Sequence, residues 1–391
     1  MFHDPSNDES AGPLKGLTIA MMGGLGPGPF CGMLLGDLGA EVVRVDRISE
    51  VDGTLPPDEV LRRNQRSIAV DVKTPRGREI VLALAKRSDA FVDVYRPGVM
   101  ERLGLGPEDL MVQRPDLAYV RVTGYGQDGP LAQMAGHDIN FVSLSGALHA
   151  IGVSEMPVPP LNLIGDFGGG GMLAAVGLLS AIFEARQSGR GQIVDVAMID
   201  GAALLMAPIY GMFARGMWQD RRQANLVDGG AHFYRTYETA DGKHFAVGAI
   251  EPQFYAEFCA LLGETPPQDY DDPESWDAHA ERIATRFRQK TRGEWEHELT
   301  SSQSCASPVL SLDEAPEHPQ NRYRSNFARV RDVVQPAPAP RFSRTRPMIR
   351  TEPSLPGDHT LDVLRELGYT EEMMDAAAAD GIVRQSATAR E

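Results

Sequence analysis

Cysteine is scarce in this sequence, and its positions exclude two kinds of protein. The 391 residues include three cysteines, Cys31, Cys259 and Cys305, which are odd in number and far apart. A disulfide-stapled secreted domain needs paired cysteines at short spacings, and a zinc site needs clustered ones. We therefore expect no disulfide framework, no metal site and a reducing, cytoplasmic compartment.

Basic residues and long apolar runs are also few. The chain has 38 Lys and Arg residues against 54 Asp and Glu residues, which gives a net charge of −16. A chain this acidic is a poor match for nucleic acid or an anionic membrane surface. The apolar stretch 172–183 is shorter than the roughly 20 residues of a membrane span, and the polar residues 1–10 do not resemble a signal peptide. We expect neither a nucleic-acid nor a membrane partner.

The negative charge is concentrated in three stretches. Residues 264–281 hold seven acids and no Lys or Arg, residues 1–10 hold three acids and no base, and residues 371–391 hold five acids and two bases. The rest of the chain is close to neutral. The overall acidity therefore says little about the charge of a binding site.

Strand-like and helix-like segments alternate over the first half of the chain. Apolar strands are expected at 17–22, 41–46, 67–72, 90–95, 117–122 and 192–196, and helices at 30–38, 74–86, 172–186 and 199–215. Buried strands that alternate with helices are typical of a parallel, doubly wound sheet. We predict an α/β fold whose large domain is a Rossmann-like, mostly parallel sheet.

The pattern changes after about residue 220. Asp-Gly at 241–242 separates two strand-like runs, 234–239 and 244–249, and predicts a hairpin. Helices are expected to follow, and we predict a smaller α+β domain over 216–330. The large domain covers 1–215 and is completed by the C-terminal segment 331–391. Within that segment, QPAPAP at 335–340 predicts a polyproline-like connector, and 361–367 a helix.

The glycine turn at 23–28 does not make a dinucleotide fingerprint. That motif needs a Gly or Ala three residues after its second glycine, but Pro29 and Cys31 occupy the two positions in question. Pro27 and Pro29 also remove two N–H groups that a pyrophosphate would bind. The turn is therefore interpreted as structural, because its glycines let the strand and the helix pack closely. Since the dinucleotide motif is absent, an NAD-dependent dehydrogenase is disfavoured.

Three polar residues beside glycine-rich or apolar segments are candidates for a functional site. Each of them also has a purely structural interpretation. His137 lies between Gly136 and an apolar run, where it is a structural histidine or a base at a helix start. Asp166 precedes four glycines, either as a helix N-cap or because a ligand approaches the backbone. Glu251 ends a strand before a helix, where it complements the helix dipole or serves a site.

Arginines gather near the ends of the expected strands. They are Arg44, Arg47, Arg62, Arg63, Arg66 and Arg96. Ligands of open α/β sheets bind beyond the carboxyl ends of the strands, where guanidinium groups bind phosphates well. The alternative is a solvated basic face that pairs with nearby acids.

Taken together, several motifs resemble the family III CoA-transferase (CaiB/BaiF) superfamily. They are GLGPGP at 24–29, LGAEVVRVD at 38–46, YRPG at 95–98, Gly165-Asp166 with its glycines, GQIVDVAM at 191–198 and PAPRFS at 338–343. Within that superfamily, GHDINF at 136–141 and GAIEPQFY at 248–255 resemble the α-methylacyl-CoA racemases rather than the transferases. The resemblance covers about residues 12–370.

The resemblance implies an isomerase of lipid and fatty-acid metabolism. Such an enzyme epimerises 2-methyl-branched acyl-CoA thioesters by proton transfer at C2 through an enolate. His137 and Asp166 would be the acid/base pair, and Glu251 would hydrogen-bond His137. CoA would be part of the substrate, with no metal or redox cofactor. The implied CoA contacts are Arg47, Val70, Asp71, Val72, Lys73, Val94, Tyr95, Arg96, Arg102, Gly136, Asp138, Ile139, Asn140 and Phe141.

The resemblance also implies an interlocked homodimer, with each site between the large domain of one subunit and the small domain of the other. Two other functions stay open. In a family III CoA-transferase, Asp166 would instead be a nucleophile that forms an acyl anhydride. In a non-catalytic protein, the same residues would bind a CoA thioester without reaction.

Overall fold

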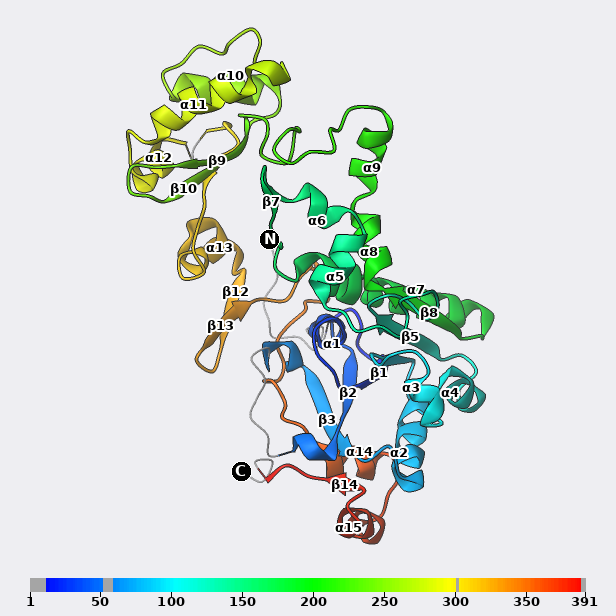
Figure 1. Ribbon diagram of the computed structural model, residues 1–391. Coiled ribbons are helices and arrows are strands. Elements are labelled where there is room, and N and C mark those ends of the chain that lie inside the picture. Colours follow the sequence, from blue (N-terminus) through cyan, green and yellow to red (C-terminus); the bar gives the residue numbers. More distant parts are fainter. Residues whose placement is uncertain (1–11, 52–58, 300–301, 388–391) are drawn as a thin grey trace. The chain divides into compact units, whose positions relative to one another are not determined.

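The computed structural model describes residues 12–51, 59–299 and 302–387, which form two compact units (Figure 1). The first unit comprises the described parts of 1–145, 161–205 and 323–391, and the second comprises those of 146–160 and 206–322. This division differs from the predicted one, since the large unit ends ten residues earlier, at 205, and the segment 146–160 joins the small unit.

The first unit is built on one sheet of seven strands. The six longest strands are parallel, and the short C-terminal strand pairs antiparallel with β3 at one edge. The order across the sheet is β14-β3-β2-β1-β4-β5-β8. The strands are β1 (Thr18–Met22), β2 (Glu41–Asp46), β3 (Gln65–Val70), β4 (Ala90–Asp93), β5 (Ala118–Thr123), β8 (Gln192–Ala197) and β14 (Val383–Arg384). The predicted doubly wound sheet is confirmed: successive strands are added toward one edge from β1 to β3 and toward the other edge from β4 onward, so the strand order reverses between β1 and β4.

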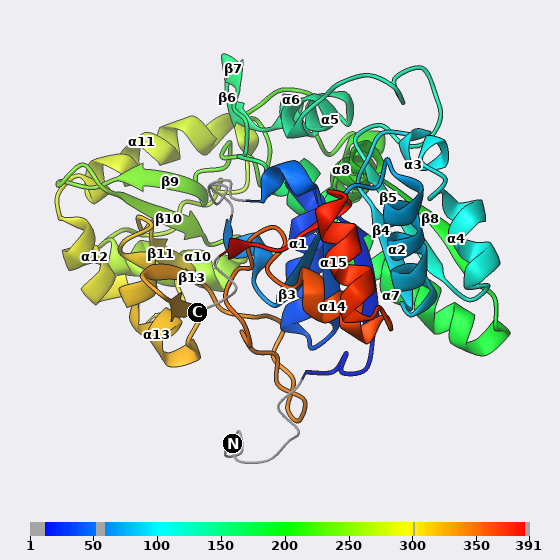
Figure 2. The same ribbon diagram turned by 90° about the horizontal axis from the view of Figure 1, so that it is seen from below.

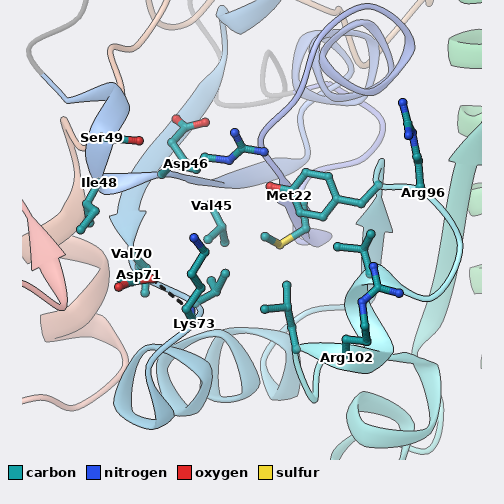
Figure 3. Close-up of a pocket in the computed structure, with 15 residues that line it drawn as sticks. Met22, Val45, Asp46, Ile48, Ser49, Val70, Asp71, Lys73, Arg96 and Arg102 are labelled. Atoms are coloured by element: carbon teal, nitrogen blue, oxygen red, sulfur yellow. Dashed lines mark hydrogen bonds between the residues drawn. The ribbon is translucent and has the colours of Figure 1, made fainter. Parts of the chain in front are cut away.

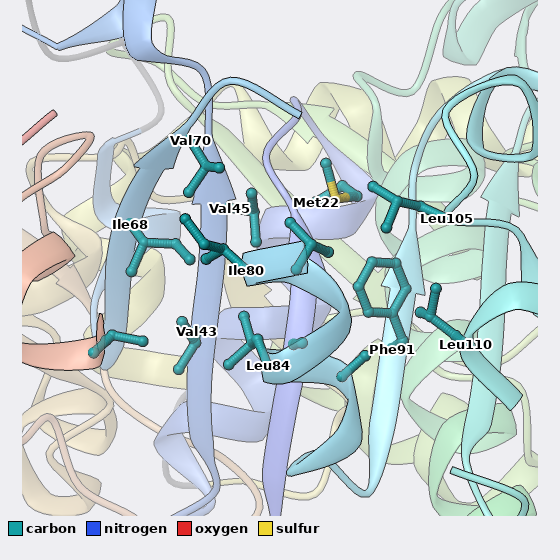
Figure 4. Packing of buried hydrophobic residues seen from close by; sticks show 14 of the residues in the cluster. Met22, Val43, Val45, Ile68, Val70, Ile80, Leu84, Phe91, Leu105 and Leu110 are labelled. Carbon is teal, nitrogen blue, oxygen red and sulfur yellow. The ribbon is translucent and has the colours of Figure 1, made fainter. Parts of the chain in front are cut away.

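Side chains of each strand alternate between two apolar layers. In β1, Ala20 and Met22 join the cluster on one face, whereas Ile19 and Met21 join the cluster on the other. Helices α2 (Pro75–Lys86), α3 (Val99–Arg102), α4 (Pro107–Gln113), α14 (Thr360–Glu366) and α15 (Glu371–Ala379) cover the first face, and α1 (Pro27–Asp37) and α7 (Leu173–Ser188) cover the second (Figures 2 and 4). Burying each large apolar side chain contributes about 1.5–3 kcal/mol, so both layers stabilise the sheet that carries the site.

The helices of the first unit are α1 (Pro27–Asp37), α2 (Pro75–Lys86), α3 (Val99–Arg102), α4 (Pro107–Gln113), α5 (Asp138–Leu144), α7 (Leu173–Ser188), α8 (Met198–Leu205), α14 (Thr360–Glu366) and α15 (Glu371–Ala379). The helices predicted at 30–38, 74–86, 172–186 and 361–367 begin within three residues of those positions, whereas the predicted helix 199–215 is divided into α8 and a second helix, Ala207–Ala214. Short 3₁₀ turns, η2 (Ile48–Glu50) and η3 (Glu59–Arg62), lie between β2 and β3. Pro75 begins α2, and the Thr74 side chain accepts a hydrogen bond from the Gly77 amide, as its Thr-Pro start predicts.

The segment before α7 is a π-helix, η4 (Leu163–Met172), which runs directly into α7. The continuous helix Leu163–Ser188 has 26 residues and is long and apolar enough to cross a membrane, unlike the shorter run read from the sequence. Its inner face packs on the sheet through Leu178 and Ile182. Core helices pass the same length and composition test, so this property alone is weak support for a membrane span.

The second unit is an α+β arrangement around a separate apolar core. The predicted Asp-Gly hairpin is confirmed, and a third strand pairs with it on one side. The strands are β9 (Tyr234–Glu238), β10 (His244–Gly248) and β11 (Ala306–Pro308), and the main helices are α9 (Ala207–Ala214), α10 (Pro252–Leu261), α11 (Trp276–Phe287) and α12 (Arg292–Leu299). Tyr255, Phe258 and Phe287 lie at the centre of this core.

The segment 146–160 joins the second unit because Arg222 binds it. It forms α6 (Ala147–Ala150) and a small hairpin of β6 (Gly152–Val153) and β7 (Met156–Pro157). The Arg222 guanidinium donates hydrogen bonds to the carbonyls of His149, Val153 and Ser154 at 2.8–3.2 Å. These contacts could not be read from residues about 70 positions apart in the sequence.

Two segments that stood out in the sequence by their composition contain regular secondary structure. In the acidic stretch 264–281, Glu264 pairs with Arg286 at 2.7 Å, and the last residues belong to α11. The predicted connector 335–340 begins inside β13 (Val333–Pro336), which pairs with β12 (Phe327–Val330). Gln335 is buried because its side-chain oxygen accepts a 2.6 Å hydrogen bond from Arg63. Helix α13 (Pro319–Arg324) precedes this hairpin.

Candidate active site

A cavity of about 750 Å³ lies at the carboxyl ends of β1, β2, β3 and β4 (Figure 3). These strands flank the position where the strand order reverses, which is where open α/β sheets bind ligands. The lining residues are Met22, Val45, Asp46, Arg47, Ile48, Ser49, Val70, Asp71, Val72, Lys73, Tyr95, Arg96, Val99, Arg102 and Leu103. We call this space the cationic cavity.

Four cationic side chains, Arg47, Lys73, Arg96 and Arg102, line the cationic cavity. The carboxylate of Asp46 does not cancel their charge, because it accepts hydrogen bonds from the buried Arg44 guanidinium at 2.8–2.9 Å and from the Ser67 hydroxyl at 2.6 Å. The cavity therefore presents positive charge beside an apolar floor, which suits a phosphate-bearing ligand with an apolar part.

Tyr95 forms part of the wall between the cationic cavity and the rest of the site. The Arg47 guanidinium carbon lies 5.9 Å from the centre of its ring. Burial raises the pKa of the Tyr95 hydroxyl, and the charge of Arg47 partly offsets that effect. Tyr95 therefore stays neutral and offers an apolar face with a hydroxyl at its edge.

Several arginines of the predicted cluster serve the scaffold instead. Arg44 and Arg63 are buried, and Arg63 pairs with Asp37 at 2.6 Å. Arg66 bridges Glu41 and Glu366 at 2.7–2.8 Å, and Arg62 is also buried. Of the six arginines near strand ends, Arg47 and Arg96 line the cationic cavity. Arg66 corresponds to the alternative of a solvated face that pairs with acids, whereas the buried Arg44, Arg62 and Arg63 fit neither interpretation.

A second cavity of about 480 Å³ adjoins the first, since Tyr95 and Arg96 line both. Its lining includes His137 and Asp166, the two predicted acid/base groups. Apolar and backbone groups make up most of the remainder: Leu25, Gly26, Pro27, Val94, Pro97, Val122, Thr123, Gly124, Tyr125, Ala132, Met134, Ala135, Gly136, Asn140, Phe141 and Met198. We call this space the catalytic cavity. One extended ligand can occupy both cavities.

His137 is the residue before the first turn of α5 and is exposed toward solvent. Its backbone N–H donates to the side-chain oxygen of Asn140 at 3.0 Å, and its carbonyl accepts from the Asn140 amide at 2.8 Å. This reciprocal pair fixes the start of the helix and leaves the imidazole outside it. The imidazole is therefore available for proton transfer.

Asp166 lies in the π-helix η4 and is half-buried. Its Oδ2 accepts a hydrogen bond from the Asn162 side chain at 3.2 Å. Burial raises the pKa of Asp166, and the neighbouring Asp138 carboxylate raises it further, while Asn162 and His137 lower it. A carboxyl whose pKa rises toward neutrality exchanges protons more readily with a weak carbon acid.

The glycines that follow Asp166 allow close packing of helices. A Cβ on Gly201 of α8 would lie 2.1 Å from the carbonyl oxygen of Gly169, and a Cβ on Gly171 would lie 2.7 Å from Phe30 of α1. The N-cap interpretation is wrong, because Asp166 is inside a helix and not its N-cap. The approach of a ligand to this segment stays a prediction. Gly26 (φ +66°) also comes close, since its Cβ would lie 3.3 Å from Asp166 Oδ2.

The structure distributes the predicted CoA contacts between the two cavities. Arg47, Val70, Asp71, Val72, Lys73, Tyr95, Arg96 and Arg102 line the cationic cavity, and Val94, Gly136, Asn140 and Phe141 line the catalytic cavity. Asp138 and Ile139 line neither: Asp138 is buried and Ile139 is 44% exposed. Sequence reasoning missed Tyr125, whose ring packs edge-on against Phe141. Its place in a Thr-Gly-Tyr-Gly turn after β5 was the available signal.

Glu251 belongs to the second unit, where it directly precedes α10. It is exposed, and its carbonyl accepts the Tyr255 amide at 3.0 Å. The pKa of the Cys305 thiol is raised mainly by desolvation, and the negative charge of Glu251 raises it further. Its hydrogen bond with His137 stays a prediction. Within residues 12–51, 59–299 and 302–387, no group of three or more His, Cys, Asp or Glu side chains is arranged to hold a metal ion.

Comparison with known proteins connects this site to CoA chemistry. The family model of CoA-transferase family III matches residues 14–360. An alpha-methylacyl-CoA racemase of Mus musculus is 43% identical over 380 residues, which cover 95% of this chain and 97% of the mouse protein. The Homo sapiens protein of that name is 41% identical, with 95% and 98% coverage.

A solved structure agrees with the fold. The crystal structure of a CAIB/BAIF family protein from Brucella suis superposes with a TM-score of 0.80, covering 91% of this chain and all of the other, at 23% identity. At that identity the likeness concerns the fold alone. It places the sheet, the helical layers and the small unit in one known architecture.

Proposed function

The chain belongs to CoA-transferase family III, and from that premise we propose that it racemises 2-methyl-branched acyl-CoA thioesters at C2. One observation carries the proposal: His137 and Asp166 line the same cavity, directly beside a cavity with four exposed cations. The relatives that are 43% and 41% identical over nearly the whole chain support the same activity.

The reaction needs two proton-transfer groups because the proton leaves one face of C2 and returns to the other. In one direction the Asp166 carboxylate removes the C2 proton, and the imidazolium of His137 delivers its own proton to the opposite face. The step ends with protonated Asp166 and neutral His137, which start the reverse direction. Each group is thus the base for one enantiomer and the acid for the other.

The intermediate is an enolate, whose oxygen needs a positioned donor. The first backbone N–H groups of α5 have no partner inside the helix, and the amide of Asp138 follows His137 directly. We assign this amide to the thioester oxygen, where a preorganised donor stabilises developing negative charge. The helix dipole of α5 adds to that effect.

The CoA moiety is assigned to the cationic cavity. Arg47, Lys73, Arg96 and Arg102 bind its phosphates, and the apolar floor around Met22 and Val70 contacts its adenine or pantetheine parts. Binding energy from these remote groups orients C2 between the catalytic groups. Arg96 and Tyr95 line both cavities and bring the two parts of the substrate together.

The proposal includes a homodimer. In the first unit, α5, η4, α7, β8 and α8 contact one another and carry nine exposed apolar side chains. They are Ile139, Leu144, Leu163, Met172, Val176, Phe183, Ile193, Leu204 and Leu205, each 44–70% exposed. We propose that a second copy covers this face, and that Glu251 orients His137 in the assembled site. Light scattering should then give the mass of a dimer for the wild-type protein and of a monomer for the double variant Val176→Asp/Phe183→Asp.

The test of the proposed reaction is exchange of the C2 hydrogen in D2O. Wild-type protein should incorporate deuterium from either enantiomer of a 2-methylacyl-CoA, and a panel of fatty, bile-acid-like and short aryl-propionyl thioesters identifies the acyl class. Retention of all C2 hydrogen from both enantiomers throughout the panel would contradict the proposal. An acyl group trapped on Asp166 by hydroxylamine, with turnover that requires a free-acid acceptor, would instead establish a CoA-transferase.

A further inference from the structure

The side chain of Asp138 is buried and contacts the backbone of Asp166, one of the two proposed catalytic groups. Asp138 is the first residue of α5, directly after His137, and is 7% exposed. Its Oδ1 accepts a 2.7 Å hydrogen bond from the backbone N–H of Asp166, which is 28 residues away in the sequence. One carboxylate therefore connects the segment that carries His137 to the segment that carries Asp166.

The Asp166 amide needs an acceptor from outside its own helix. In a π-helix each N–H bonds to the carbonyl five residues earlier, so the N–H groups of the first turn have no partner within the helix. Asp166 is the fourth residue of η4. The next amide, that of Phe167, reaches back to the Asn162 carbonyl at 3.3 Å, whereas the Asp166 amide donates to Asp138. Asp138 thus caps η4 from a neighbouring helix.

Gly165 makes the close approach of this carboxylate possible. A Cβ on Gly165 would lie 2.5 Å from Oδ1 of Asp138 and 3.0 Å from its Cγ. Gly165 does not have a left-handed backbone, so the Asp138 carboxylate, and not backbone strain, excludes a side chain there. The two residues fit each other as a pair.

The charged groups that act on Asp166 come from the start of α5. They are Asp138, whose charge raises the pKa of Asp166, and His137, whose charge lowers it. The acids of the neighbouring β8 and α8, Asp195 and Asp200, are not among the groups that shift it.

Other elements packed against η4 contact it through uncharged groups. Helix α1 contributes Pro27 and Phe30, and α8 contributes Met198, Gly201 and Leu205. Within the described residues, Asp138 is therefore the acidic neighbour through which the protonation of Asp166 can be tuned.

We propose that Asp138 is a positioning residue, whose carboxylate holds Asp166 at a fixed place relative to His137. Because like charges repel, it also makes Asp166 hold a proton more tightly. The kinetic consequence rests on the proposed racemase function, whereas the contact and its effect on Asp166 do not. Asp138 itself transfers no proton to substrate.

The first test separates charge from hydrogen bonding. Asp138→Asn keeps a side-chain oxygen for the Asp166 amide but removes the negative charge. Asp109→Asn is a matched control, because Asp109 also accepts one backbone N–H, that of Gly106, at 2.9 Å in the first turn of a helix. Asp166 is titrated by NMR of protein labelled with 13C at aspartate carboxyls, and its signal is assigned with Asp166→Asn.

We expect Asp138→Asn to lower the pKa of Asp166 and Asp109→Asn to leave it unchanged. In kcat/KM profiles the acidic limb should move to lower pH in both reaction directions, because the acid/base pair titrates as a unit. An unmoved Asp166 titration in folded Asp138→Asn protein would overturn the inference. Wild-type protein without C2 exchange would instead refute the racemase proposal, while the NMR titration would still decide the role of Asp138.

The second test is a double-mutant cycle on the fitted pair. Asp138→Ala should lower kcat by about 10- to 100-fold through misplacement of Asp166, with little change in KM. Gly165→Ala displaces the same carboxylate and should cause a similar loss. If the contact is the cause, the double variant is no worse than either single variant. Losses that multiply in the double variant, with thermal midpoints near wild type, would overturn the proposal.

Discussion

The cationic and catalytic cavities adjoin, but they are built in different ways. Four exposed side chains supply the charge of the cationic cavity: Arg47, Lys73 and Arg96 follow β2, β3 and β4, and Arg102 ends α3. In the catalytic cavity, His137 and Asp166 lie on two helix starts joined by the buried Asp138 carboxylate and by glycines that admit close packing. Under the proposed function, recognition of CoA is therefore distributed over separate side chains, whereas the proton transfer depends on a few shared contacts.

The largest expected effect tests whether the catalytic cavity can lose its activity while the cationic cavity still binds CoA. His137→Ala and Asp166→Asn should each lower C2 exchange by about 10²- to 10⁴-fold, the usual contribution of a general acid or base. Free CoA should bind both variants as tightly as wild type in calorimetry, because the cationic side chains are unchanged. If both variants retained full exchange, the assignment of the acid/base pair would be wrong. A parallel loss of CoA affinity would show that the cavities do not act separately.

The next effect concerns the scaffold beneath the cationic cavity. Asp93 ends β4 directly before the wall residues Val94–Arg96 and is 3% exposed. Burial raises the pKa of Asp93 to about 6, although the Tyr95 amide and the charge of Arg121 pull it down. Above that pKa, folding holds a buried carboxylate ionised at a cost in stability. Below about pH 4 the carboxyl is protonated in both folded and unfolded states, and the cost is absent.

Asp93→Asn should therefore stabilise the fold at pH 7, by up to about 3 kcal/mol for a shift of about two pKa units. The gain should shrink as the pH falls from 6 toward 4, as measured by urea unfolding of both proteins across that range. Arg121 keeps its pairing with Glu101 in the variant. A gain that stays constant with pH would show that ionisation of Asp93 is not its cause.

The sheet could be predicted from the sequence because its strands are local patterns. Apolar runs such as 41–46, and the Asp-Gly turn at 241–242, depend on neighbours in the chain, and the structure has them within about two residues. The π-helix 163–172 could not be predicted in that way, since four consecutive glycines suggest a loop. Their helical state depends on α1 and α8, which come from distant parts of the sequence.

In the candidate site, too, features that depend on local sequence could be predicted, and contacts between distant segments could not. Arginines near strand ends indicated the edge of the sheet where the cationic cavity lies, but this signal does not distinguish Arg47, which lines the cavity, from Arg63, which pairs with Asp37. The meeting of His137 with Asp166 came from family resemblance, because their spacing of 29 residues carries no pattern. The contact of Asp138 with the Asp166 amide depends on how α5 and η4 pack together. It could not be predicted from the sequence of either segment alone.

A smaller effect tests whether the cations of the cationic cavity contribute to substrate binding separately. Arg102→Ala and Lys73→Ala should each raise the KM for acyl-CoA about tenfold with kcat unchanged, since an exposed cation contributes about 1.4 kcal/mol or less to binding a phosphate. Arg66→Ala is the control, because Arg66 bridges Glu41 and Glu366 and does not line the cavity. Steady-state kinetics at two salt concentrations would check this, and a loss of kcat in Arg102→Ala would argue against it.

The smallest effect tests how finely Asp166 is tuned by its neighbours. Asn162 donates to Asp166 Oδ2 at 3.2 Å and lowers the pKa of that carboxyl, opposite in sign to the effect of Asp138. Asn162→Ala should therefore move the acidic limb of kcat/KM to higher pH. The shift should be only a few tenths of a unit, because an exposed hydrogen bond contributes about 0.5 kcal/mol and one pKa unit corresponds to about 1.4 kcal/mol. Opposite shifts in Asn162→Ala and Asp138→Asn would show that two side chains set the proton affinity of Asp166 between them. Shifts of the same sign would mean that both variants act by moving the helix, and the electrostatic part of the comparison would fail.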